Sequence, residues 1–173
     1  MVSSFRWILL TLLVTSCRPG SSPEGNGTIS VEWRGSSAGT FRASATARWC
    51  VADTLLEVLA VRNDTAVGFA LVAQDSVRAA SYPVNETRLW TPGRPQANVG
   101  LRWLTPLELL GYEGYGGAVL VTSGNSLAIS GTLDARLRPH RGADTLRLVG
   151  RFTNIPIVPA APPCGRANRP GHS

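Results

Sequence analysis

Few residues of this 173-residue chain are of types and spacings that could do chemistry. Residues 35–39 read Gly-Ser-Ser-Ala-Gly and match the G-x-S-x-G pattern of a serine-hydrolase nucleophile elbow. That elbow joins a strand to a helix and needs an acid and then a histidine downstream. Here the motif lies between two predicted strands, while His140 falls in a turn and His172 in the C-terminal tail. We therefore interpret residues 35–39 as a hairpin turn.

The acidic residues suggest a second possible chemistry, in which two carboxylates act as general acid and base. Glu108, Glu113, Asp134 and Asp144 could be combined in this way. Such pairs act only when the two groups lie about 5–10 Å apart. The sequence does not establish that proximity, so solvated surface charges are the favoured interpretation.

The composition removes further classes of reaction. All 17 basic residues are arginine, so a lysine Schiff base and a P-loop lysine are excluded. The sequence also contains no dinucleotide-binding glycine motif, zincin motif or acidic calcium loop. We expect a protein that is not an enzyme, has no catalytic residues and needs no metal or cofactor.

The N-terminus has the pattern of an export signal. Arg6 precedes an apolar run at 7–14, which is shorter than the roughly 20 residues of a membrane-spanning helix. Residues 13–17, Leu-Val-Thr-Ser-Cys, resemble the lipobox of bacterial envelope lipoproteins, and the chain as a whole resembles small β-rich lipoproteins of GC-rich bacteria. An ordinary secretory signal is the alternative.

The lipobox resemblance implies that residues 1–16 are a signal peptide and that Cys17 is the lipidated first residue of the mature chain, carrying acyl groups such as palmitate. It further implies an exported protein, lipid-anchored to a membrane on the periplasmic or cell-surface face of the cell envelope. Residues 17–27 then form a flexible tether, because they contain no apolar run.

The remaining cysteines suggest a disulfide bond. If Cys17 carries lipid, Cys50 and Cys164 are left as a pair in an oxidising compartment. Closing a loop of about 100 residues contributes roughly 4–5 kcal/mol in the chain-entropy description. Two free thiols are the alternative, and metal binding by two distant cysteines is less favoured.

The chain between the tether and the tail alternates apolar and polar residues with the period of a half-buried strand. We predict one all-β domain at 28–164, followed by a loose tail at 165–173. About eight strands separated by turns are typical of an antiparallel β-sandwich, with a closed β-barrel as the alternative. The expected strands are 29–33, 40–49, 55–62, 66–72, 97–104, 118–122, 127–138 and 144–154.

Two further local features enter the prediction. Residues 105–108, Thr-Pro-Leu-Glu, match a capping box and predict at most one short helix, running to residue 110. Aromatic residues gather beside proline and glycine between residues 82 and 117. They form either a recognition surface or, as is more usual, part of the core beneath a long loop.

Four arginines define the candidate binding surface. The strands 127–138 and 144–154 are predicted to pair, and their polar faces carry Arg136, Arg138, Arg147 and Arg151. A basic sheet face of this kind suits anionic polymers, lipid headgroups or acidic proteins. The alternative interpretation is that arginine replaces lysine as the solubilising residue. Nucleic acid is not expected as a partner, because the protein is exported and lacks exposed aromatics between its basic residues.

These features together predict a membrane-anchored lipoprotein that acts as a non-catalytic binding or assembly module of the cell envelope. Its partners are then the membrane, through the N-terminal lipid, and either an envelope protein or an anionic polymer. The alternative is a lipocalin-like carrier of an apolar ligand. A carrier requires an unfilled barrel interior, whereas a binding module packs its interior tightly.

Overall fold

The computed structural model describes residues 27–50, 54–73, 76–89, 91 and 93–159. This part of the chain is all-β, with one turn of 3-10 helix, η2 (Thr87–Leu89). None of its helices is long and apolar enough to cross a membrane. The strands are β1 (Thr28–Gly35), β2 (Gly39–Cys50), β3 (Leu55–Arg62), β4 (Thr65–Val72), β5 (Ala80–Pro83), β6 (Gln96–Leu104), β7 (Leu109–Gly124), β8 (Ala128–Pro139) and β9 (Leu146–Pro159).

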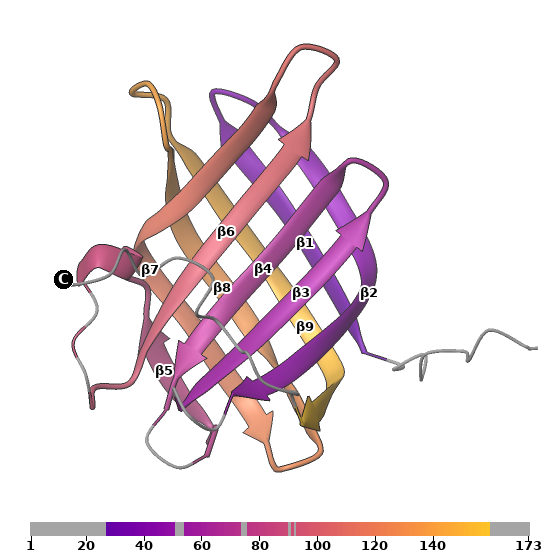
Figure 1. Cartoon of the computed structure of the whole chain (residues 1–173), viewed down its shortest axis with the longest axis vertical. Coiled ribbons are helices and arrows are strands. Elements are labelled where there is room, and N and C mark those ends of the chain that lie inside the picture. The colour runs from indigo at the N-terminus through magenta and orange to yellow at the C-terminus, as the bar shows by residue number, and fades with distance from the viewer. Residues whose placement is uncertain (1–26, 51–53, 74–75, 90, 92, 160–173) are drawn as a thin grey trace, which may run out of the picture.

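Eight of the strands form a closed antiparallel barrel (Figure 1). Their order around the barrel is β7-β6-β4-β3-β2-β1-β9-β8, and β8 pairs again with β7. The short strand β5, in the β4–β6 connection, adds to the edge of β7. The all-β prediction is confirmed, but the β-sandwich is wrong and the barrel alternative is correct. The reason is that β1 and β9 pair with each other over eight positions and so close the sheet.

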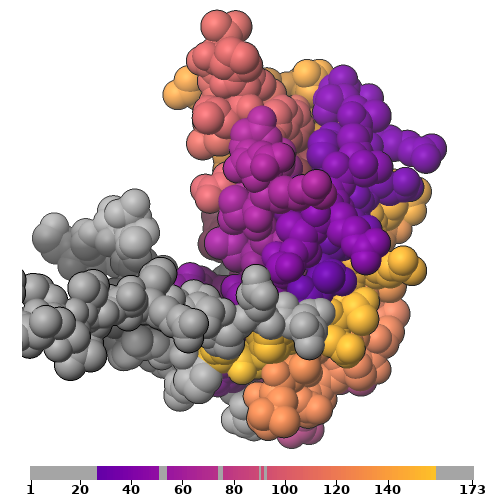
Figure 2. Space-filling view, turned by 90° about the vertical axis from the view of Figure 1, so that its right-hand side faces the viewer, coloured from indigo at the N-terminus to yellow at the C-terminus, as the bar shows by residue number. Residues whose placement is uncertain are grey.

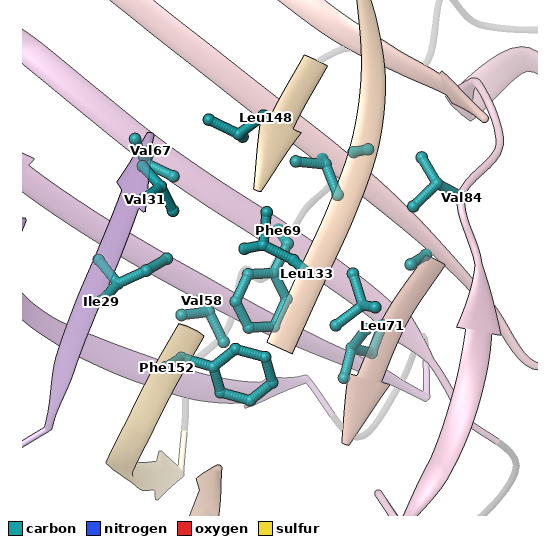
Figure 3. Close-up of a cluster of buried hydrophobic side chains, with 14 of the residues drawn as sticks. Ile29, Val31, Val58, Val67, Phe69, Leu71, Val84, Leu133, Leu148 and Phe152 are labelled. Atoms are coloured by element: carbon teal, nitrogen blue, oxygen red, sulfur yellow. The ribbon is translucent and has the colours of Figure 1, made fainter. Parts of the chain in front are cut away.

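The barrel interior holds one continuous apolar cluster (Figure 3). The alternation seen in the sequence places one face of every strand inside, as in β2, where Phe41, Ala45 and Ala47 are buried. Phe69 and Phe152 reach toward each other from opposite walls, with ring centroids 4.8 Å apart. Burial of such side chains stabilises the fold by about 1.5–3 kcal/mol for each large one.

An aromatic stack lies where the β6–β7 turn meets the end of β1. The rings of Trp33 and Trp103 are 5.8 Å apart, and those of Trp103 and Tyr112 are 5.2 Å apart. Tyr82 is also buried. The core interpretation of the aromatics therefore holds for Tyr82, Trp103 and Tyr112.

The predicted helix at 105–110 is wrong. The hydroxyl of Thr105 does accept a hydrogen bond from the Glu108 amide at 3.0 Å, as an N-cap would. However, the Thr105 amide donates to the Glu108 carbonyl at 2.8 Å and closes a tight turn. Pairing of β6 with β7 then outweighs the local preference for a helix.

The structure contains two stretches of strand that were not expected from the sequence, namely β5 and the first half of β7. Residues 109–117 contain four glycines, which lower strand propensity. Gly117 adopts a φ of +104°, and a Cβ there would lie 2.1 Å from the Asp134 carbonyl oxygen. The glycine is thus required where β7 bends closely over β8.

Both hairpins predicted from the sequence are present. Residues 35–39 connect β1 to β2, and the predicted pairing of the last two strands is realised as β8–β9. Cys50 is buried at the end of β2. Cys17, Cys164, the signal peptide, the tether and the tail at 165–173 lie outside the described residues, so lipidation and the disulfide stay predictions.

Candidate functional site

The predicted basic residues lie on the outer wall of β8 and β9. Arg136 stands directly opposite Arg147, and Arg151 stands opposite Thr132 on the same outer face. All three side chains are exposed because the alternating partners Ala135, Leu148 and Phe152 turn inward. Arg138 follows two residues after Arg136 on the same outward face of β8, so all four predicted arginines share this wall.

Two further arginines extend this surface across β1 and β2. Arg34 is in register with Arg147, which gives a row Arg34–Arg147–Arg136 over three adjacent strands. Arg42 and Arg151 flank Ser30 in a second row. We call this surface the arginine face, made of Arg34, Arg42, Arg136, Arg147 and Arg151. Figure 2 looks onto its β1 and β2 side, with β9 and β8 at the lower right edge.

The charges of the arginine face are only partly compensated. Arg147 donates to Asp134 through Nε at 3.0 Å and Nη2 at 2.6 Å. These hydrogen bonds, aided by the charges of Arg147 and Arg136, hold the pKa of Asp134 below its ordinary value. The same hydrogen bonds and the negative charge of Asp134 raise the pKa of Arg147. Arg34 lies 3.8 Å from Glu32. Arg136 lies over the ring of Tyr115 at 5.6 Å, as in a cation–π contact.

Arg42 and Arg151 have no ion pair within the described part of the chain. Both line a hollow of about 840 Å³ over β1, β2 and β9, together with Arg62 from the β3–β4 turn. Glu32 and Asp64 also border it. The sequence did not reveal Arg34, Arg62 or the hollow. Closure of the barrel places Arg34 on β1 beside β9, and Arg62 reaches Arg42 across the β2–β3 pair, donating to its carbonyl at 3.1 Å.

The fourth predicted arginine, Arg138, forms an ion pair within the fold. Arg138 on β8 pairs with the buried carboxylate of Glu86, which also accepts from Arg88 Nε at 2.5 Å. A buried carboxylate is costly unless it is paired in this way. Arg138 therefore belongs to a structural network that fixes the segment before η2 to the barrel.

A second carboxylate, Glu113 on β7, completes this network. It accepts from the amide and the hydroxyl of Thr87, at 3.0 and 2.8 Å, and from the side chain of Asn98 at 2.9 Å. Burial raises the pKa of Glu113, but these hydrogen bonds and the charge of His140 outweigh it and hold the pKa below its ordinary value. A carboxyl group with a lowered pKa is a poor general acid.

The four carboxylates considered as acid–base partners have separate roles. Glu113 is bound by the donors described above, and Asp134 is bound by Arg147. Glu108 lies in the β6–β7 turn and Asp144 in the β8–β9 loop. Over residues 27–50, 54–73, 76–89, 91 and 93–159, no three histidine, cysteine or acidic side chains form a metal-binding group.

The outer wall of β3, β4, β6 and β7 carries a groove, also of about 840 Å³. Its floor consists of outward positions without large side chains, and Leu59 and Leu109 form its apolar walls. We call it the glycine-floored groove. The floor residues are Ala66, Gly68, Ala70, Gly100 and Gly111.

Comparison with known proteins yields no relative: no protein-family model, no curated protein and no solved structure matches the chain.

Proposed function

We propose that the protein is a lipid-anchored bacterial lipoprotein that acts as a non-catalytic binding module of the cell envelope. Its arginine face binds an anionic polymer. The observation that carries this proposal is the placement of five exposed arginines in two cross-strand rows on one wall, against the two acids Glu32 and Asp134 on the same face.

The arrangement of charge favours ligand binding over simple solubility. Solubilising charges are usually interspersed in sign over the surface. Here like charges occupy facing positions of neighbouring strands, which destabilises a sheet. Arg42, Arg62 and Arg151 moreover line a hollow, where a chain of anionic groups can contact several guanidinium groups at once.

The proposed anchor fits this activity. The lipobox at residues 13–17 would place acyl chains on Cys17, and residues 18–27 would connect the lipid to β1 at Thr28. Tethering raises the local concentration of the arginine face near envelope polymers, so modest intrinsic affinity suffices.

A lipocalin-like carrier is the second candidate, and the closed barrel of consecutive strands favours it. The packing of the interior weighs against it, because Phe69 and Phe152 meet across the barrel and are surrounded by buried aliphatic residues. Native mass spectrometry of the purified protein would favour the carrier if an apolar ligand stayed bound.

The binding test compares two charge-matched variants of the mature chain. Arg42→Glu with Arg151→Glu reverses two charges on the arginine face, and Arg78→Glu with Arg94→Glu reverses two exposed charges elsewhere. Polyphosphate serves as the anionic polymer and dextran as the neutral one, with affinity measured by isothermal titration calorimetry. We expect the first variant to lose about tenfold or more in polyphosphate affinity, equivalent to 1.4 kcal/mol. Equal losses in both variants would contradict the proposal.

The anchor has a separate test in a bacterial host that processes lipoproteins. The wild-type chain should appear in the membrane fraction with the mass of an acylated chain that begins at Cys17. Cys17→Ser should lose the acyl mass and the membrane association. A wild-type chain without acyl mass would overturn the anchoring part of the proposal, whatever the outcome of the polymer titration.

A further inference from the structure

The glycine-floored groove lies on the wall formed by β3, β4, β6 and β7 (near side of Figure 1), away from the arginine face on β1, β2, β8 and β9. Cross-strand pairs Leu59–Gly68 and Gly68–Gly100 place its floor along one row of the sheet. The neighbouring rows add Ala70 and Ala66. With a spacing of about 4.8 Å between strands, four strands span roughly 14 Å.

Packing does not explain the glycine at position 100. A Cβ built there would meet only the Tyr112 carbonyl oxygen, at 3.9 Å, which is an ordinary contact. Gly68 differs, because a Cβ there would lie 2.9 Å from the Val58 carbonyl oxygen. Glycine inside a strand is destabilising by roughly 0.5–1 kcal/mol relative to alanine, and it marks a bulge, a tight bend, or the close approach of a ligand or another backbone. What Gly100 provides is open space in the groove.

One end of the groove is cationic. Arg102 on β6 stands opposite Gly111 on β7, and the His140 amide donates to the Gly111 carbonyl at 3.2 Å. Arg102, His140 and Arg141 therefore line the same border, together with Glu108 from the β6–β7 turn. Within the described residues, neither Arg102 nor Arg141 forms an ion pair.

Away from this end the groove lining is apolar or neutral, apart from one ion pair, and Glu113, which stands opposite Gly100 on β7, is held by Thr87 and Asn98. Leu59 and Leu109 keep 44% and 60% of their surfaces exposed, so both offer apolar surface to a ligand in the groove. At the border far from Arg102, Arg48 and Glu57 compensate each other at 3.9 Å. The groove thus presents an apolar body and one cationic end.

We propose that the glycine-floored groove binds a single-chain lipid phosphate. The alkyl chain lies over Gly100 and Gly68 against Leu59, and the phosphate is held by Arg102 and Arg141. Two guanidinium groups favour a phosphate monoester over a carboxylate because the phosphate offers three terminal oxygens and up to two negative charges, whereas the carboxylate offers two oxygens and one charge. This site is independent of the arginine face and does not require the anionic-polymer proposal to be correct.

The test measures binding of dodecyl phosphate, below its micelle concentration, to the mature protein by isothermal titration calorimetry. Gly100→Leu should fill the groove and lower the affinity at least tenfold, as should Arg102→Glu. The matched control is Ser44→Leu, which adds the same side chain to an exposed position of β2 outside the groove. Circular dichroism and thermal unfolding show whether each variant is folded.

A milder variant keeps the result interpretable if Gly100→Leu fails to fold. Gly100→Ala meets no clash and should preserve or increase stability, while reducing affinity for dodecyl phosphate by a smaller factor. Full retention of affinity in both folded Gly100 variants would overturn the proposed location.

Three further ligands test the chemical class. Inorganic phosphate should bind far more weakly than dodecyl phosphate, because it lacks the chain. Dodecyl maltoside should also bind more weakly, because it lacks the charge. Laurate should be weaker than dodecyl phosphate, and equal or tighter laurate binding would overturn the assignment of the phosphate head. Retained binding in Arg42→Glu with Arg151→Glu would separate this site from the arginine face.

Discussion

Arg136 and Arg147 lie directly opposite each other on β8 and β9, both exposed on the outer wall of the barrel. Facing like charges on antiparallel strands repel each other. Asp134, two residues before Arg136, relieves the repulsion by accepting two hydrogen bonds from Arg147. The carboxylate of Asp134 thus offsets part of the repulsion between the two arginines.

Replacing that carboxylate should affect stability and binding in opposite directions. Asp134→Asn removes the carboxylate that Arg147 contacts beside Arg136, so the free energy of unfolding at neutral pH should fall slightly. Polyphosphate affinity should rise, because the arginine face gains net positive charge. Urea unfolding and calorimetric titration check the two effects, with Asp144→Asn in the β8–β9 loop as the control. A variant with weaker polyphosphate binding would argue against the arginine face as the binding surface.

The same carboxylate should contribute to the acid sensitivity of the fold. The folded-state pKa of Asp134 is below its ordinary value of 3.8, so the unfolded chain takes up the proton first as the pH falls. Its stabilisation is therefore complete above the ordinary value and is lost as the pH falls through the lower folded-state pKa. Unfolding free energies measured between pH 2 and pH 6 should show a smaller pH dependence for Asp134→Asn than for the wild type. Identical slopes would exclude the proposed contribution.

The core of the barrel should be sensitive to one aromatic ring. Phe152 is in register with Gly131 on β8, and a Cβ at Gly131 would lie 2.6 Å from the Phe152 ring. Phe152→Ala should lower the free energy of unfolding by about 3–5 kcal/mol, because it also removes the contact with Phe69. Thr153→Ala, at the exposed neighbouring position, is the control in urea unfolding. A loss below about 1 kcal/mol would show a loosely packed interior and would favour the carrier.

Much of the barrel was readable from the sequence because its strands alternate so regularly. Residues 40–49 alternate at every position and correspond closely to β2, and the loop at 139–143 marks the β8–β9 hairpin. Barrel closure was not readable in the same way. The pairing of β1 with β9 joins residues more than a hundred positions apart, and local patterns carry no information about it.

The candidate sites show the same division. Arg136, Arg147 and Arg151 could be placed on one face because they share a predicted hairpin. Arg138 could not be separated from them, since its partner Glu86 lies far away in the sequence. The glycine-floored groove could not be predicted from the sequence either. A glycine such as Gly100 only lowers the strand propensity of its segment, and the open space above it is known from the structure alone.

The network around Glu86 should matter for stability, not for binding. Glu86→Gln removes the charge that Arg88 and Arg138 share, and the buried amide would pair with only part of their donors. We expect a loss of about 1–3 kcal/mol in the free energy of unfolding, with unchanged polyphosphate affinity.

Glu32→Gln is the contrasting variant, because Glu32 is exposed and lies 3.8 Å from Arg34 on the arginine face. It should leave stability nearly unchanged and raise polyphosphate affinity. If Glu86→Gln instead changed polyphosphate affinity and left stability unchanged, Glu86 and its partner Arg138 would belong to the binding surface.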